Sequence, residues 1–281
     1  MAPAEAENQT SHNAPAVNAE APAVLQILPT LQTGGVERGT VDIAAALTAA
    51  GWRAIVASAG GAMAHEIQRV GGTHVTLPVD SKNPLIMRKN INAIANVIRT
   101  HNVGIVHARS RAPAWSARSA AQKCGVPFMT TFHGTYNFSN PAKKAYNAIM
   151  TKGERIIAIS EFIGRHIEEN YGVSREKIRV IPRGVDTESF NPDAVSAERM
   201  IQLSNAWRLP DDAPVVMLPG RLTRWKGQSV LIEAARRLAR DNVRVLLVGD
   251  DQGRTGYREE LEAQIGRIGA EGIIHLTGPC R

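Results

Sequence analysis

The chain has 281 residues with a hydrophobic fraction of 43%, which fits a soluble globular protein longer than one typical domain. Two distant cysteines give neither a metal-binding spacing nor a disulfide framework, so a reducing compartment, the cytoplasm, is expected. The net charge of +7 indicates an anionic partner, and charge alone leaves nucleotide, nucleic acid and acidic lipid open. No apolar run is long enough to span a bilayer.

Residues 1–22 are rich in Ala, Pro, Asn and Glu and show no apolar stripe. This composition predicts a disordered tail. The first cation of the chain is Arg38, so the charged amino-terminal region of a signal peptide is also absent from this segment.

The following residues alternate between strand-like apolar runs and helical patterns, which is typical of a doubly wound parallel sheet. Strands are expected at residues 24–28, 53–58, 73–78, 103–108, 126–133, 155–160 and 177–182. Helices are expected at residues 36–50, 62–70 and 84–101, with further helical patterns between the later strands. These elements predict an α/β domain over residues 23–190.

A second α/β series follows an irregular, proline-containing segment, which we interpret as a linker at residues 191–213. Strands are expected at residues 215–219, 243–249 and 272–278, the first of them a buried apolar run, with a helix after each of the first two. A doubly wound domain has six strands, so residues 214–281 would form only part of one. Either the sequence is a fragment, or the second half of this domain is lost in nature.

Paired glycines open the first helix in the sequence TGGVERG at 33–39. Gly34 and Gly35 would let the backbone approach a ligand, while the helix amino terminus favours negative charge. A tight turn without a ligand is the alternative. The order of glycines differs from G-x-G-x-x-G, and no stretch matches G-x-x-x-x-G-K-[ST], which disfavours a nicotinamide enzyme and a P-loop ATPase.

The sequence PGRLTRWKG at 219–227 places three cations in a turn between a strand and a helix. Ligands of open α/β sheets bind at such turns, and the free N–H groups of a helix start favour anions. Arg221, Arg224 and Lys226 are therefore expected to face a bound anion.

Two histidines end apolar strands, where a side chain can donate to an anionic oxygen or polarise a leaving group. A core histidine is the alternative for both; it is favoured for His107 and disfavoured for His133, which the turn TFHG leaves at the strand end. Gly184, in PRGVD at 182–186, permits a turn and would serve structurally as a hinge.

Together these motifs resemble the retaining glycosyltransferases of family four, which have the GT-B fold. The resemblance rests on the ordered set GGVER (34–38), TFHG (131–134), AIS (158–160), PRGVD (182–186), PGRLTRWKG (219–227) and VGD (248–250). It implies two Rossmann-like domains facing a cleft, with the second, here incomplete, binding a nucleotide-diphosphate sugar donor. It further implies transfer to a saccharide or lipid-linked acceptor with retention of configuration, in envelope polysaccharide or glycolipid synthesis.

The resemblance also assigns roles to single residues. Arg221 and Lys226 would hold the donor diphosphate without a metal or other cofactor, and Arg224 would be a supporting cation. His133 would lie beside the reacting sugar as the catalytic residue. The substrate-binding residues implied in this way are Gly34, Gly35, Gly184, Arg221, Lys226 and Gly249.

Two departures from the family pattern keep other functions open. Arg183 occupies a position where the family more often has Asn, and the E-x(7)-E element that contacts the donor is absent before Arg281. A catalytically inactive sugar-nucleotide-binding protein and a GT-B nucleotide-sugar epimerase are therefore alternatives. Nucleic-acid binding has only the charge in its favour, because aromatic residues are 5% of the chain and no nucleic-acid-binding motif is found.

Residues 137–155 mix apolar and aromatic side chains with lysines, a composition suited to an anionic membrane surface. The alternative is an ordinary core-facing helix with a basic outer face. A peripheral location on the inner face of the membrane is the corresponding expectation.

Overall fold

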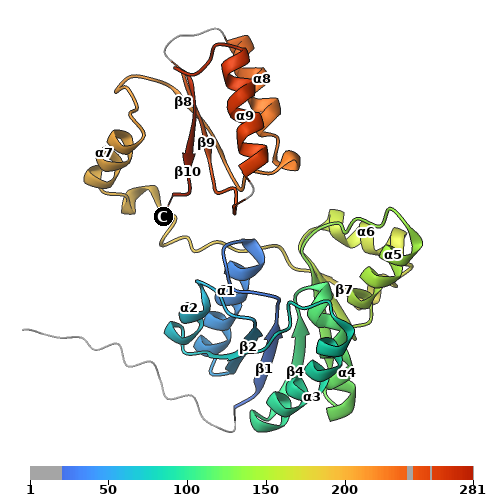
Figure 1. The fold of residues 1–281 in the computed structure, drawn as a ribbon. Helices are drawn as coiled ribbons and strands as arrows, with labels where there is room; N and C mark the ends of the chain where they lie inside the picture. Colours follow the sequence, from blue (N-terminus) through green and yellow to red (C-terminus); the bar gives the residue numbers. More distant parts are fainter. Residues whose placement is uncertain (1–20, 239–242, 254, 281) are drawn as a thin grey trace, which may run out of the picture. The chain divides into compact units, whose positions relative to one another are not determined.

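The computed structural model describes residues 21–238, 243–253 and 255–280. The chain divides into two compact units, and the boundary between them lies between Gly184 and Val185. We call them unit 1 and unit 2 and describe each by itself (Figure 1). Most of the expected disordered tail, residues 1–20, lies outside the described residues.

Unit 1 contains a parallel sheet of seven strands in the order β3-β2-β1-β4-β5-β6-β7. The strands are β1 Ala23–Ile27, β2 Arg53–Ser58, β3 Thr73–Thr76, β4 Val103–Ala108, β5 Phe128–Phe132, β6 Arg155–Ala158 and β7 Ile178–Val180. Each lies within one residue of, or inside, a run expected from the sequence. The parallel doubly wound fold is therefore confirmed for this unit.

Helices connect these strands and cover both faces of the sheet. They are α1 Gly35–Ala49, α2 Ala64–Arg69, α3 Pro84–Thr100, α4 Arg111–Cys124, α5 Pro141–Asn147 and α6 Glu161–Tyr171, with short 3₁₀ turns η1 Ala148–Thr151 and η2 Arg175–Lys177. Local signals fix several ends. Asn83 accepts a hydrogen bond from the Leu85 N–H before Pro84 starts α3, and Gly125 and Gly172 end α4 and α6 in the left-handed conformation.

Two apolar clusters lie on opposite faces of this sheet. Val41 and Ile67 of α1 and α2 pack with Val56 of β2, whereas Ile94 of α3 packs in a larger cluster with Ile27 of β1. Because both faces are covered, all five residues of β1 are buried. All strands are parallel, so their carboxyl ends share one edge of the sheet, where ligands bind in such folds.

Unit 2 contains a parallel sheet of three described strands in the order β10-β9-β8. Its elements are α7 Ala197–Ala206, β8 Val215–Pro219, α8 Gln228–Leu238, β9 Arg244–Val248, α9 Thr255–Arg267 and β10 Ile274–Gly278, with 3₁₀ turns η3 Pro192–Ala194 and η4 Arg224–Lys226. The helices α8 and α9 lie on the same side of this sheet (Figure 1). Ile232 of α8 and Leu261 of α9 pack against Val245 and Leu247 of β9 to form the core.

Two sequence expectations for unit 2 are wrong. The segment 191–213, expected to be irregular, contains α7, which Ser196 caps by accepting a hydrogen bond from the Arg199 N–H. None of the residues of α7 is buried, although Met200, Ile201 and Leu203 give it an apolar side; the nearby prolines Pro192 and Pro210 led to the irregular interpretation. The run expected to form a buried strand, β8, is half exposed, with Val215 at 45% and Met217 at 50%, because it lies at an edge of the sheet.

Candidate functional site

The paired glycines of unit 1 lie at the start of α1, with Gly34 as its N-cap. A side chain at Gly34 would press against the carboxylate of Glu37, whereas Gly35 faces open space. The first N–H groups of a helix have no intrahelical acceptor. The carboxylate of Glu37 therefore lies near the positive end of α1, where its charge would oppose the binding of an anion.

Arg109 follows β4 and is buried at the carboxyl edge of the sheet, with an exposed fraction of 4%. Its guanidinium donates to Gln26 at 2.9 Å, and Gln26 donates to the carbonyl oxygen of Thr40 at 3.2 Å. The pKa of Arg109 is lowered to about 10, mainly by burial and also by the nearby charge of Arg183, against an opposing effect of Asp42. Its Nε has no hydrogen-bond partner among the described residues.

His133 follows β5, and neither of its buried ring nitrogens has a hydrogen-bond partner in the described part of the chain. Its pKa is lowered to about 3, first by burial and then by the positive charges of Arg109 and Arg183. The imidazole is therefore neutral at physiological pH. One ring nitrogen can donate and the other can accept a hydrogen bond, and neither bond is made within the described protein.

His107, by contrast, is a core residue of β4. It is buried, and its Nε2 forms a hydrogen bond of 2.7 Å with the hydroxyl of Thr131 on the neighbouring strand. Burial holds its pKa well below 6.5, with further lowering by Arg109 and His133. The favoured core interpretation of His107 fits this geometry.

Arg183 donates to the carbonyl oxygen of Gly35 at 2.5 Å and lies across Gly39 of α1. This contact joins the PRGVD motif, near the carboxyl end of unit 1, to the glycine turn near the start of its sheet. Gly184 faces open space and does not have a positive φ, so the backbone here does not require glycine.

The cationic turn of unit 2 is held by close backbone packing. Gly220 has a φ of 154°, and its N–H donates to the carbonyl oxygen of Val248 at 2.8 Å. A side chain at Gly249 would overlap the backbone carbonyl of Gly220. Leu222 inserts into the apolar core and anchors the turn. Gly249 therefore has a packing role whether or not a ligand binds.

The three cations of this turn differ in their partners. Arg224 forms a salt bridge of 2.5 Å with Glu260 and lies over the ring of Tyr257. Arg221 donates to the neutral side chain of Gln252 at 3.0 Å, and Lys226 lies over the exposed ring of Trp225. Within the described residues, neither Arg221 nor Lys226 has a carboxylate partner.

The predicted site residues therefore form two groups, one in each unit. His133 is influenced by Arg109 and Arg183 in unit 1, and the contact of Arg183 with Gly35 extends this group to the glycine turn. Sequence reasoning missed Arg109, although a cation directly after a buried strand was a usable signal. It also missed Glu37 and Glu260, whose charges matter only because the fold places them beside Gly34 and Arg224. No cluster of three or more potential metal-binding side chains occurs among the described residues.

The stretch at 137–155 is only partly available to a membrane. Ile149 and Met150 belong to the core of unit 1, whereas Lys143 and Lys144 are exposed on α5. No helix in the described ranges combines the length and apolar character needed to cross a bilayer.

Two family models match the chain. Residues 33–189 match Glycosyltransferase Family 4, and residues 200–280 match Glycosyl transferases group 1. Curated relatives include the D-inositol 3-phosphate glycosyltransferase of Xylanimonas cellulosilytica, 28% identical over 57% of this chain and 41% of the relative. The enzyme of the same name from Thermobifida fusca is 28% identical over 57% of this chain and 40% of its own length. The matched region thus spans about two fifths of these relatives.

Solved structures extend the comparison. A glycosyltransferase from Rickettsia africae is 37% identical, with a TM-score of 0.82 over 93% of this chain and 69% of its own. Anabaena HepE in complex with UDP and glucose has a TM-score of 0.77 at 21% identity, over 92% of this chain and 70% of its own. These neighbours establish an α/β fold of the GT-B type.

Proposed function

The chain belongs to Glycosyltransferase Family 4, and from this premise we propose that it transfers a sugar from a nucleotide-diphosphate sugar to an acceptor. Anabaena HepE, with the same fold, has been solved with UDP-glucose, which supports a donor of this class. Transfer of a hexose with retention of configuration is part of the proposal.

The observation that carries the proposal is the difference among the cations at the start of α8. Arg224 is neutralised by Glu260, whereas Arg221 and Lys226 have only neutral described partners. Two such cations beside the free N–H groups of a helix suit a diphosphate, whose charge increases as the sugar departs. Gly249, packed against Gly220, keeps the backbone of this turn in place.

In unit 1 the proposal assigns the sugar-side contacts to His133 and the glycine turn. A neutral imidazole with two free nitrogens can donate to one substrate oxygen and accept from a hydroxyl group. With a pKa of about 3, His133 would act by hydrogen bonding rather than as a positive charge. Gly34, Gly35 and Gly184 would border the bound sugar, with Arg183 fixing the carbonyl of Gly35.

For the acceptor we propose a saccharide or a lipid-linked saccharide, in envelope polysaccharide or glycolipid synthesis in the cytoplasm. The name of the curated relatives includes a phosphorylated polyol, D-inositol 3-phosphate, which supports a hydroxyl-bearing acceptor. Attachment to an anionic membrane surface would rest on the exposed Lys143 and Lys144, because Ile149 and Met150 are in the core.

The test measures the fate of the labelled sugar of UDP-glucose and compares three alanine variants. Arg221→Ala and Lys226→Ala should each weaken transition-state binding, measured as kcat/KM, by about 2 to 4 kcal/mol, the effect of removing one preorganised charge-stabilising group. Arg224→Ala is the matched control and should have a much smaller effect, since its charge is already paired.

The destination of the label separates the alternatives. Label on an acceptor supports glycosyl transfer, label on an altered nucleotide sugar supports an epimerase, and donor binding without turnover supports an inactive binding protein. Equal kcat/KM for the three variants and the unaltered chain would contradict the assignment of the diphosphate to this turn.

A further inference from the structure

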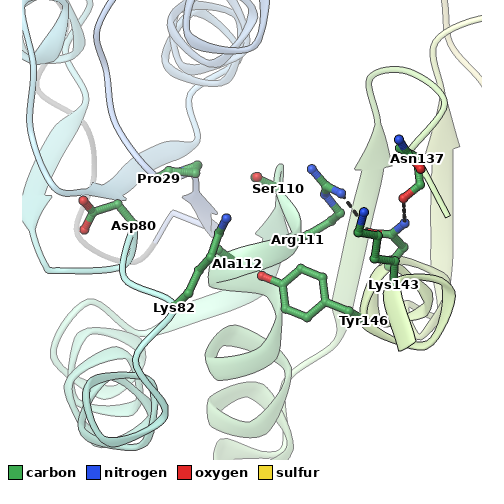
Figure 2. Close-up of a pocket in the computed structure, with 10 residues that line it drawn as sticks. Pro29, Asp80, Lys82, Ser110, Arg111, Ala112, Asn137, Lys143 and Tyr146 are labelled. Carbon is green, nitrogen blue, oxygen red and sulfur yellow. Dashed lines mark hydrogen bonds between the residues drawn. The ribbon is translucent and has the colours of Figure 1, made fainter. Parts of the chain in front are cut away.

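Two buried amide side chains, one in each unit, differ in how fully they are hydrogen bonded. In unit 1, Asn147 accepts from Arg111 at 2.8 Å and donates to the carbonyl oxygen of Asn137 at 3.0 Å (Figure 2). In unit 2, the Nε2 of Gln228 donates to the carbonyl oxygen of Arg221 at 2.9 Å. Its Oε1 is buried and has no hydrogen-bond partner among the described residues. Gln228 is therefore a half-satisfied amide, in a side chain with an exposed fraction of zero.

The unpaired oxygen of Gln228 is unfavourable for folding. A buried acceptor has lost its hydrogen bonds to water, and an apolar side chain of similar length would avoid this cost and fill the same space. Gln228 is the first residue of α8 and comes directly after the cationic turn. Its bond to Arg221 of that turn is what an apolar residue could not provide. The polar side chain therefore serves the turn rather than the stability of the core.

Glycines at both ends leave the cationic turn with few restraints of its own. Gly220 and Gly227 have φ values of 154° and 86°, which residues with side chains rarely adopt. Arg221 follows the first of these glycines, and its guanidinium donates to Gln252 at 3.0 Å. The direction of this side chain depends on the backbone from which it projects. Bonds that fix the backbone at Arg221 therefore also aim its guanidinium.

The peptide group between Arg221 and Leu222 is held at both ends. Its carbonyl oxygen accepts from Gln228 at 2.9 Å, and its N–H donates to the carbonyl oxygen of Asp250 at 3.0 Å. Because a peptide group is planar, two bonds at opposite ends keep its plane from rotating. The hydroxyl of Thr223 also donates to the Arg221 carbonyl oxygen, but at 3.5 Å, which is long for such a bond. Gln228 is therefore the stronger donor to this carbonyl.

We propose that Gln228 is a positioning residue, which holds the backbone of Arg221 so that its guanidinium faces the donor diphosphate. The holding of the backbone rests on the hydrogen bonds of the turn, whereas the role toward the diphosphate rests on the proposed function. Gln228 acts through Arg221 rather than on the ligand, because its own side chain is fully buried. A cation oriented in advance loses less freedom when the anion binds, which strengthens binding.

Isothermal titration calorimetry of the whole chain with UDP tests this role. Gln228→Met removes the amide while keeping the length of the side chain, and it should weaken UDP binding at least fivefold. Gln264→Met is the matched control, because the Nε2 of Gln264 donates to the carbonyl oxygen of Ser229 at 3.1 Å, a bond of the same kind made from α9. The control should change the affinity less than twofold. Equal UDP affinity in Gln228→Met and the unaltered chain would overturn the proposal.

A double variant distinguishes positioning of one residue from a general loosening of the turn. Because Gln228 acts through Arg221, adding Gln228→Met to Arg221→Ala should weaken UDP binding less than twofold beyond Arg221→Ala alone. A general loosening would also displace Lys226, which belongs to the same turn. The double variant would then bind UDP at least fivefold more weakly than Arg221→Ala, and that result would overturn the positioning role.

The variant Gln228→Glu tests the hydrogen bond itself, because its ability to donate depends on pH. A protonated carboxyl group can donate to the Arg221 carbonyl oxygen, whereas an ionised one cannot and repels it. Relative to the unaltered chain at the same pH, UDP affinity should be within twofold at pH 5 and at least fivefold weaker at pH 9. A ratio that stays constant would contradict the proposal. This comparison within one variant also holds where Gln228→Met fails to fold.

Hydrogen exchange of residues 219–227 separates this proposal from the proposed function. Exchange of the turn should be at least fivefold faster in Gln228→Met than in the unaltered chain, while β9 keeps its protection. UDP binding that is equal in the two chains would retain the donor and overturn the role of Gln228. Absence of UDP binding in the unaltered chain would refute the proposed donor. Faster exchange of the turn would then still support the holding of Arg221, and unchanged exchange would overturn it.

Discussion

Strand β1 of unit 1 and strand β8 of unit 2 are both short apolar runs in parallel sheets, yet their burial is opposite. All five residues of β1 are buried, whereas four of the five residues of β8 are exposed. β1 lies inside a seven-stranded sheet with helices on both faces, and β8 lies at an edge, in a unit where α8 and α9 share one side. Burial is therefore set by what surrounds a strand, while its apolar composition shows only that it can be buried.

The largest expected effect comes from truncating a side chain in each strand. Leu25→Ala in β1 should lower the free energy of unfolding of unit 1 by about 2 to 5 kcal/mol, because the leucine is fully buried. Met217→Ala in β8 should cost about 1 kcal/mol or less, because half of that side chain is already exposed. Hydrogen exchange resolved by peptide, in increasing denaturant, measures each unit separately. Equal costs in the two strands would contradict the comparison.

A smaller effect is expected from a glycine of unit 2. Gly249→Ala should destabilise unit 2 by about 1 to 3 kcal/mol, because the new methyl group overlaps the backbone carbonyl of Gly220 and the turn must shift. Gly256→Ala, at a position in α9 that faces open space, is the matched control and should be neutral or slightly stabilising. The same exchange measurement should show faster exchange in β8 and β9 while β1 keeps its protection. A stable Gly249→Ala variant would show that the turn is not closely packed.

The third comparison concerns pH and the histidines of the two units. His107 and His133 in unit 1 have pKa values lowered from 6.5, to about 3 for His133. Above pH 6.5 the two imidazoles are mostly neutral in the folded and in the unfolded chain. As the pH falls below 6.5, the unfolded chain gains protons that the folded unit does not, so stability is lost, by up to about 2 kcal/mol per histidine at pH 5. In unit 2 the one histidine is His275, whose pKa is lowered by burial and by Arg244.

The variant His107→Asn with His133→Asn should reduce the loss of stability of unit 1 between pH 7 and pH 5. His65→Asn, at an exposed position of α2, is the control and should leave this pH dependence unchanged. Denaturant unfolding followed by exchange at both pH values provides the measurement. An identical pH dependence with and without the two buried histidines would show that they do not account for it.

Sequence patterns predicted the elements of unit 1 well and those of unit 2 less well. The bounds of β2 and β4 coincide with the expected runs at 53–58 and 103–108, because each apolar run is bounded by polar residues, glycine or proline within a few positions. The helix α7 was missed, because the proline-containing segments that flank it were interpreted as part of an irregular linker. The exposure of β8 was also missed, since a run of apolar residues does not specify its neighbours.

The candidate site shows the same division. The strand-to-helix turns could be located from the sequence, and so could Arg221, Arg224 and Lys226, because glycines and cations after an apolar run are local features. The resemblance already set Arg224 apart as a supporting cation, but only the structure identified its partner, Glu260, which is 36 residues away in α9. The buried hydrogen bond between Arg109 and Gln26 joins residues 83 positions apart and could not be read from either segment alone.

The sequence by itself determined the order of strands and helices, the parallel α/β class and the turns at which ligands could bind. These properties follow from the period of apolar residues and from the backbone preferences of glycine and proline, which act over a few residues. The tertiary structure alone decided that Arg224 pairs with Glu260, that His107 bonds to Thr131, and that Arg109 reaches Gln26. Charge pairing and burial depend on groups brought together by the packing of distant segments, and that packing leaves no periodic signal in any one of them.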